Sequence, residues 1–217
     1  MFYTTTELRA QTKHEELANG LSHGIAMLAA LIGAPFLIQH AIAVGTTAFV
    51  IGTSIFAATI ILLYLASACY HLLPPGETKH LFRVLEHSAI FLLIAGTYTP
   101  ILLGVLNGSW GLSLLIAIWS FALIGVLLKV YAPHFPAFIS TLLYLLMGWV
   151  IIVAIKPLVA VMAPAGIYWL VAGGLSYTIG VLFFIADSRI PYGHFIWHLW
   201  VMAGTSCHYY AVYKYGA

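Results

Sequence analysis

The sequence predicts an all-α membrane protein, a seven-transmembrane helix bundle with its N-terminus in the cytoplasm and its C-terminus outside. Of its 217 residues, 63% are hydrophobic and only 6% are Asp, Glu, Lys or Arg, whereas a soluble domain carries roughly 25% charged residues. So few charges cannot cover the surface of a soluble fold. Seven apolar segments and an uneven distribution of Lys and Arg between the loops complete the prediction.

Each predicted helix is a run of about 20 mostly apolar residues, the length that crosses a bilayer. In chain order the runs cover residues 19–43, 47–71, 83–105, 109–131, 136–156, 164–186 and 192–214. The breaks between them carry residues that are typical of loops: Gly45, Pro74 to Gly76, Asn107 to Ser109, Pro133 to Pro136, Pro157, Pro164 and Pro191. Because these connections are short, we expect one domain over residues 1–217, in which residues 1–16 form a polar cytoplasmic segment.

Lys and Arg residues in short loops set the orientation of a membrane protein, because they are enriched on the cytoplasmic side. Six cations fall on the N-terminal side of the predicted membrane, namely Arg9, Lys13, Lys79, Arg83, Lys129 and Arg189. Only Lys156 and Lys214 fall on the other side. This bias predicts a cytoplasmic N-terminus, and the odd number of spans then predicts an external C-terminus. The net charge of +2 is too small and too scattered to indicate a nucleic-acid partner.

Ionisable and hydroxyl side chains fall at one membrane depth on three predicted helices. His194 and His198 open the last segment four residues apart, so they share a helix face at about 5–6 Å. Ser67 and His71 have the same spacing at the end of the second segment, and Glu86 lies at the start of the third. The alternating helix directions bring all of them to the cytoplasmic side. Ionisable residues inside spans indicate function by default.

This set has the composition of a catalytic zinc site. Three neutral imidazoles, from His71, His194 and His198, suit Zn²⁺, and a catalytic site keeps its fourth position for water. Glu86 would accept a proton from that water, whose pKa zinc lowers to about 7, and return it to a leaving group. Ser67 would hydrogen-bond the water, a substrate carbonyl or a ligand.

Each of these residues alone also has a plainer interpretation. Histidine pairs in membrane helices form interhelical hydrogen bonds, Glu86 can pair with Arg83, and Ser67 can be a small packing residue. His23, in the first segment, either supports the site or pairs with another helix. His208 lies about 15 Å deeper than His198 at 1.5 Å per residue, which predicts a buried hydrogen bond for it. Residues 187–189 are predicted to be a solvated loop.

Four motifs resemble the haemolysin III family, the bacterial branch of the progestin and adiponectin receptor superfamily. They are residues 15–24 (EELANGLSHG), 67–71 (SACYH), 86–100 (EHSAIFLLIAGTYTP) and 194–208 (HFIWH followed by GTSCH). The resemblance covers nearly the whole chain in the family's order. It implies seven helices, residence in the bacterial inner membrane, and an intramembrane zinc near the cytoplasmic face. The zinc ligands carry over to His71, His194 and His198, and the family's serine carries over to Ser67.

One residue departs from the family pattern, because the family usually has aspartate where this chain has Glu86. The glutamate carboxylate reaches about one methylene further. Either it ligates the metal directly, which would close the site and weaken a hydrolase interpretation, or a small helix shift absorbs the extra length.

The function that these features predict is zinc-dependent hydrolysis of a lipid amide or ester, since the superfamily includes alkaline ceramidases. A lipid of the surrounding bilayer is then the substrate. The first alternative is a non-enzymatic membrane regulator with a structural zinc, acting on membrane energetics or lipid homeostasis. Pore formation, as in a haemolysin, is a second alternative, although seven apolar spans with short loops do not resemble a secreted toxin. A proton or ion transporter that uses intramembrane His and Glu as a relay is a third, although the sequence shows no inverted repeat of the kind many transporters have.

Overall fold

The computed structural model describes residues 9–132 and 135–217, and over these residues the secondary structure is helical, without strands. Residues 1–8 of the predicted polar segment and residues 133–134 of the predicted fourth break lie outside this description. The helices are α1 (Lys13–Val44), α2 (Thr47–Leu72), α3 (Glu77–Gly104), α4 (Ser109–Tyr131), α5 (Ala137–Trp149), the 3₁₀ helix η1 (Val150–Ala154), α6 (Ile155–Val161), α7 (Pro164–Ile185) and α8 (Gly193–Tyr215).

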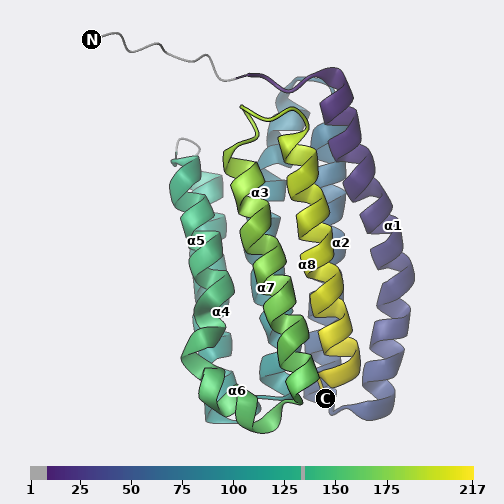
Figure 1. Cartoon of the computed structure of the whole chain (residues 1–217), viewed down its shortest axis with the longest axis vertical. Helices are drawn as coiled ribbons and strands as arrows, with labels where there is room; N and C mark the ends of the chain where they lie inside the picture. Colours follow the sequence, from purple (N-terminus) through teal and green to yellow (C-terminus); the bar gives the residue numbers. More distant parts are fainter. Residues whose placement is uncertain (1–8, 133–134) are drawn as a thin grey trace.

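The helices pack side by side into one bundle with α3 at its centre (Figure 1). Neighbours in the chain are neighbours in space from α1 to α5, α5 contacts α7, and α8 lies against both α7 and α1. The central helix α3 also contacts α5 and α8. α1 begins and α8 ends at opposite ends of the bundle (Figure 1). We call the end where α1, α3 and α8 begin and α2 ends the site end.

Two helices begin well before the predicted segments, α1 at Lys13 and α3 at Glu77. At α1 the cause is a capping box, in which the Glu15 amide donates to Thr12 Oγ1 (3.3 Å) and the Thr12 amide donates to the Glu15 carboxylate (2.8 Å). Such a box satisfies backbone N–H groups that the first turn leaves unpaired. The apolar runs mark only the part of each helix that suits a bilayer, so these predicted boundaries were wrong at the polar ends.

The fifth predicted segment, residues 136–156, also ends in the wrong place, because the helical path continues through Pro157 to Val161. Proline lacks an N–H and crowds the preceding turn, and the path accommodates it by passing through the 3₁₀ helix η1. The Tyr98 hydroxyl, from α3, accepts the Ile151 amide at 3.0 Å and lies 2.8 Å from the Gly148 carbonyl. A central helix therefore satisfies backbone groups that this irregularity would leave unpaired.

Six helices of the described residues are long and apolar enough to cross a membrane: α1, α2, α3, α4, the continuous path Ala137–Val161, and α7. This composition makes the chain a multi-pass membrane protein. α8 has 23 residues and runs along α7 and α1, yet it is not among the six. Its three histidines and several hydroxyl-bearing residues lower its hydropathy, and two of those histidines belong to the cluster described next.

The two central helices α2 and α3 pack closely enough for their backbones to meet. A methyl group on Gly52 would come within 2.9 Å of the Pro100 Cα atom, so the two backbones touch at this point. Small residues allow such approach between membrane helices, where dispersion contacts and not hydrophobic burial drive association. This contact lies near the start of α2 and the end of α3, at the opposite end of the helix pair from His71 and Glu86.

Candidate metal centre

The structure brings together the three histidines that the sequence predicts as metal ligands. His71 comes from the last turn of α2, and His194 and His198 come from the first two turns of α8. One ring nitrogen from each residue lies within 4.8 Å of those of the other two. All three side chains are buried, at 4%, 9% and 0% relative exposure in chain order.

In each of these three rings the nitrogen that lacks a hydrogen-bond partner is Nε2. The Nε2 atoms of His71, His194 and His198 are buried and have no hydrogen-bond partner among the described residues. A buried polar group without a partner costs about 1–3 kcal/mol, so three in one place call for a ligand. Three convergent imidazole nitrogens are a donor set that zinc prefers, and these residues therefore fit the predicted metal.

Glu86 lies beside the cluster, as its position at the start of the predicted third segment indicates. Its side chain is 2% exposed, and its Oε1 atom lies 3.7 Å from His71 Nε2. Within the described part of the chain Glu86 forms no ion pair with Arg83, whose side chain is exposed, so the plainer interpretation of Glu86 was wrong. Glu86 also groups with His23 and His198 as a second set of potential ligands within 4.8 Å.

Ser67 contacts the cluster through a fourth histidine, His23. Its hydroxyl oxygen lies 2.7 Å from His23 Nδ1, and both side chains are buried. The His23 ring stacks on His198 with centroids 3.6 Å apart and planes 4° apart. His23 Nε2 is buried without a partner. His23 thus combines the two roles that the sequence left open, because it pairs with Ser67 of another helix and lies against the candidate ligand His198.

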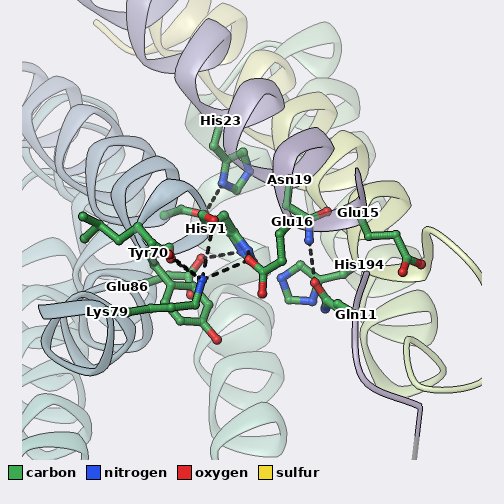
Figure 2. A network of polar contacts seen from close by, with 12 residues as sticks. Gln11, Glu15, Glu16, Asn19, His23, Tyr70, His71, Lys79, Glu86 and His194 are labelled. Atoms are coloured by element: carbon green, nitrogen blue, oxygen red, sulfur yellow. Dashed lines mark hydrogen bonds and ion pairs between the residues drawn. The ribbon is translucent and has the colours of Figure 1, made fainter. Parts of the chain in front are cut away.

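Each of the three candidate ligands has an oxygen atom next to its Nδ1 atom, and Figure 2 shows the contact of His71 with Glu16. His71 Nδ1 lies 2.9 Å from Glu16 Oε2, and His194 Nδ1 lies 3.1 Å from Asp187 Oδ2. His198 Nδ1 lies 3.2 Å from the Asn19 carbonyl oxygen and 3.1 Å from the Ser22 hydroxyl.

Sequence reasoning missed these acceptors. Asp187 was predicted to lie in a solvated loop, but its side chain is only 28% exposed and faces His194. Its position seven residues before His194 carries no helical signal, because the turn between α7 and α8 intervenes. Glu16 has no detectable link to His71 in the sequence either, since the contact joins two different helices.

The start of α8 is held in place by Glu15, from the first turn of α1. Tyr192, just before α8, has a positive φ of 57°, and its amide donates to Glu15 Oε1 at 2.7 Å. The Arg9 guanidinium donates two hydrogen bonds of 2.6 Å to the same carboxylate, and this carboxylate raises the pKa of Arg9. The first turn of α1 thereby fixes the turn from which His194 and His198 project.

A mostly apolar cavity of about 120 Å³ adjoins the cluster. His23 and Glu86 line it, and so do residues of α3 as far as Tyr98, twelve positions beyond Glu86 or about 18 Å along a helix. Side chains of α5, α7 and α8 complete the wall. His208 lines the cavity too, and its Nε2–H donates to the Leu170 carbonyl at 3.0 Å, which confirms the hydrogen bond predicted for it at a residue that is half-buried.

The sequence matches the family described as Haemolysin-III related over residues 11–209. The chain belongs to the haemolysin III family. This membership confirms the resemblance drawn from the four motifs, and the matched range includes every residue of the cluster described above. No solved structure matches this haemolysin III-family protein.

Similar proteins extend from bacteria to mammals. The chain is 40% identical to the "Hemolysin-3 homolog" of Bacillus subtilis over 94% of its own length and 95% of the relative. It is 41% identical to "Hemolysin-3" of Bacillus cereus over 93% and 91% of the two chains. It is 28% identical to the human "Monocyte to macrophage differentiation factor" over 94% and 85%. This haemolysin III-family protein therefore matches its relatives along nearly its full length.

Proposed function

We propose that this protein is a zinc-dependent hydrolase of a lipid amide or ester in the bacterial inner membrane. The observation that carries the proposal is the position of Glu86, which borders both the three-histidine cluster and the apolar cavity. Zinc would be held by His71, His194 and His198. A single apolar space that ends at a metal cluster and an acid suits a lipid whose scissile bond lies near one end of an acyl chain.

Seven spans, a cytoplasmic N-terminus and an external C-terminus complete the proposal, with residues 1–217 as one domain. α8 would be the seventh span, with His194, His198 and Thr205 facing the bundle and not the lipid. Its ligands His194 and His198 are buried, as intramembrane ionisable residues usually are. Four of the six cations assigned to the cytoplasmic side, Arg9, Lys13, Lys79 and Arg83, lie in or next to the first turns of α1 and α3.

In the proposed reaction, bound zinc would supply Lewis acidity and lower the pKa of a coordinated water to about 7. Glu86 would take a proton from the water as its oxygen bonds to the acyl carbon. The same carboxyl group would then return the proton to the amine or alcohol as the C–N or C–O bond breaks. Each cycle consumes one water and leaves Glu86 ionised again.

His23 and Ser67 would act on the substrate side of this centre. With the Ser67 hydroxyl donating to Nδ1 of His23, the His23 proton resides on Nε2. That N–H, in the wall of the cavity, could donate to the carbonyl oxygen as negative charge develops on it. Ser67 would then contribute by setting the tautomer of His23.

A metal and turnover assay tests this proposal. Purified full-length protein and His194→Ala are analysed for zinc by mass spectrometry and for release of fatty acid from ceramide and phosphatidylcholine in mixed micelles. We expect about one zinc per wild-type chain, sharply reduced zinc in the variant, and fatty-acid release by wild type alone. Stoichiometric zinc with no release from either lipid would contradict the hydrolase assignment, and unchanged zinc in His194→Ala would contradict the site.

One observation favours a structural zinc in a non-enzymatic membrane regulator as the second candidate. Glu86 Oε1 lies 3.7 Å from His71 Nε2, close enough for the carboxylate to become a fourth ligand after a small shift. Four protein ligands are typical of structural zinc, and three are typical of catalytic zinc. X-ray absorption at the zinc edge distinguishes the candidates by counting nitrogen and oxygen ligands. Haemolysis, which the names of the Bacillus relatives mention, ranks third.

A further inference from the structure

Helix α1 contributes none of the three candidate ligands, yet it supplies acceptors to two of them. Glu16 contacts His71 Nδ1, and the Asn19 carbonyl contacts His198 Nδ1. A carboxylate and a carbonyl oxygen can only accept hydrogen bonds. The proton of each neutral ring therefore resides on Nδ1, which leaves the Nε2 lone pair free to bind a cation.

Glu16 differs from the other acceptors because it is itself held by a cation. Its Oε2 atom accepts from Lys79 Nζ at 3.2 Å as well as from His71. Lys79 Nζ also donates to the carbonyl of Tyr70 at 2.8 Å and to that of Leu73 at 3.3 Å. Glu16 is thus connected to the ring of His71 directly and to the end of the α2 backbone through Lys79 (Figure 2).

Although the His71 ring packs against Tyr70, His194 and His198, Glu16 provides its one hydrogen bond within the described residues. The Nε2 atom of the ring has no partner among the described residues, and its Nδ1 atom has a single one, Glu16. Carboxylates that accept from a ligating histidine fix its tautomer and increase its basicity, and their loss typically costs 10–100-fold in metal affinity.

We propose that Glu16 is a positioning residue of the metal centre, which orients His71 in its Nε2-ligating tautomer and tightens zinc binding. The proposal rests on the zinc site of the proposed function. It assigns to α1 the task of preparing a site whose ligands all come from other helices.

Another glutamate, Glu77, offers a matched control. Glu77, also in the first turn of a helix at the site end, is exposed. Glu77→Gln makes the same chemical change as Glu16→Gln without a contact to the cluster. Glu16→Asp keeps the charge but shortens the side chain by one methylene, so its carboxylate would not keep the 2.9 Å contact with His71.

The experiment measures zinc affinity by competition with a chromophoric chelator, using detergent-purified full-length wild type and the three variants. We expect Glu16→Gln and Glu16→Asp to raise the zinc Kd about 10–100-fold and Glu77→Gln to leave it unchanged. In the Co²⁺-substituted proteins, the visible absorption bands should shift in the Glu16 variants alone. Thermal unfolding of the metal-free proteins should differ little between wild type and Glu16→Gln.

The possible outcomes distinguish a failure of the Glu16 role from a failure of the zinc site itself. Wild-type zinc affinity and an unchanged Co²⁺ spectrum in both Glu16 variants would overturn the positioning role while leaving the zinc site intact. A lower unfolding temperature of the metal-free Glu16 variants with an unchanged zinc Kd would also overturn it, because Glu16 would then only brace the fold. Wild-type protein that binds no zinc would overturn the zinc site and the role of Glu16 together.

Discussion

Single residues of this protein have different surroundings from those that their sequence neighbours suggest. Glu86 lies three positions from Arg83, which favours a helix-surface ion pair, yet its carboxylate is buried beside His71. Ser67 shares a helix face with His71, yet its hydroxyl contacts His23 from α1. In both cases the nearest polar group of the site belongs to another helix. Glu86 Oε1 has no hydrogen-bond partner among the described residues, and because an isolated buried charge is costly, an ionised Glu86 calls for a cation beside it.

Glu86→Gln tests the proton-transfer role at this scale. The amide cannot accept and return a proton, so lipid hydrolysis should fall by about 100-fold or more, while zinc content stays at the wild-type level. Metal analysis and fatty-acid release on the same preparation measure both quantities. Glu86→Asp, which restores the carboxylate usual in the family, should keep most of the activity. Loss of zinc in Glu86→Gln would instead make Glu86 a ligand.

At the scale of elements, the path from Ala137 to Val161 is the least regular part of the bundle. It passes from α5 through the 3₁₀ helix η1 to α6, and Tyr98 serves backbone groups on both sides of the change. No water is available inside a bilayer to satisfy a backbone group, so irregular backbone there needs a protein partner. Because Tyr98 also lines the cavity, this irregular path shapes the proposed lipid site.

Tyr98→Phe should therefore lower the stability of the folded protein. It removes a hydroxyl that serves the Ile151 amide and a carbonyl of the preceding turn, at an expected cost of about 1–3 kcal/mol. Thermal unfolding of the detergent-solubilised protein measures the change. Tyr131→Phe is the matched control, since Tyr131 is 79% exposed at the end of α4. Equal unfolding temperatures for the two variants would contradict this role of Tyr98.

At the scale of the whole molecule, the candidate centre joins the beginning, middle and end of the chain. α1 provides acceptors, α2 and α8 provide candidate ligands, and α3 provides Glu86. This arrangement depends on an odd number of helices that traverse the bundle, because only then do α1 and α8 both begin at the site end. The proposed membrane topology follows from the same arrangement and from the distribution of cations.

Cysteine accessibility tests that topology on the full-length chain. In a background with Cys69→Ala and Cys207→Ala, Asn107→Cys reports on the loop between α3 and α4, and Thr78→Cys reports on the start of α3. Both positions are exposed. A membrane-impermeant maleimide should label Asn107→Cys in intact cells and Thr78→Cys only after lysis. The reverse pattern would place the site end outside the cell, contrary to the charge bias.

The amino-acid sequence by itself determined the membrane class, the approximate helices and the residue types of the candidate centre. These properties follow from composition, from apolar run length and from spacings of four residues within one helix, all of which are local. His71, Glu86, His194 and His198 could be grouped from sequence because alternating helix directions assign a depth to each residue.

The depth of a residue in the membrane, however, does not determine which neighbouring helix its side chain faces. Only the tertiary structure decided that His23 stacks on His198. It also decided that Glu16 contacts His71 Nδ1 and that Asp187 contacts His194 Nδ1. The hydrogen bond between the Tyr98 hydroxyl and the Ile151 amide is a third such contact. Each of these contacts joins segments whose relative rotation and turn geometry set the distance. Packing of whole helix faces determines that rotation, and no local pattern in the chain encodes it.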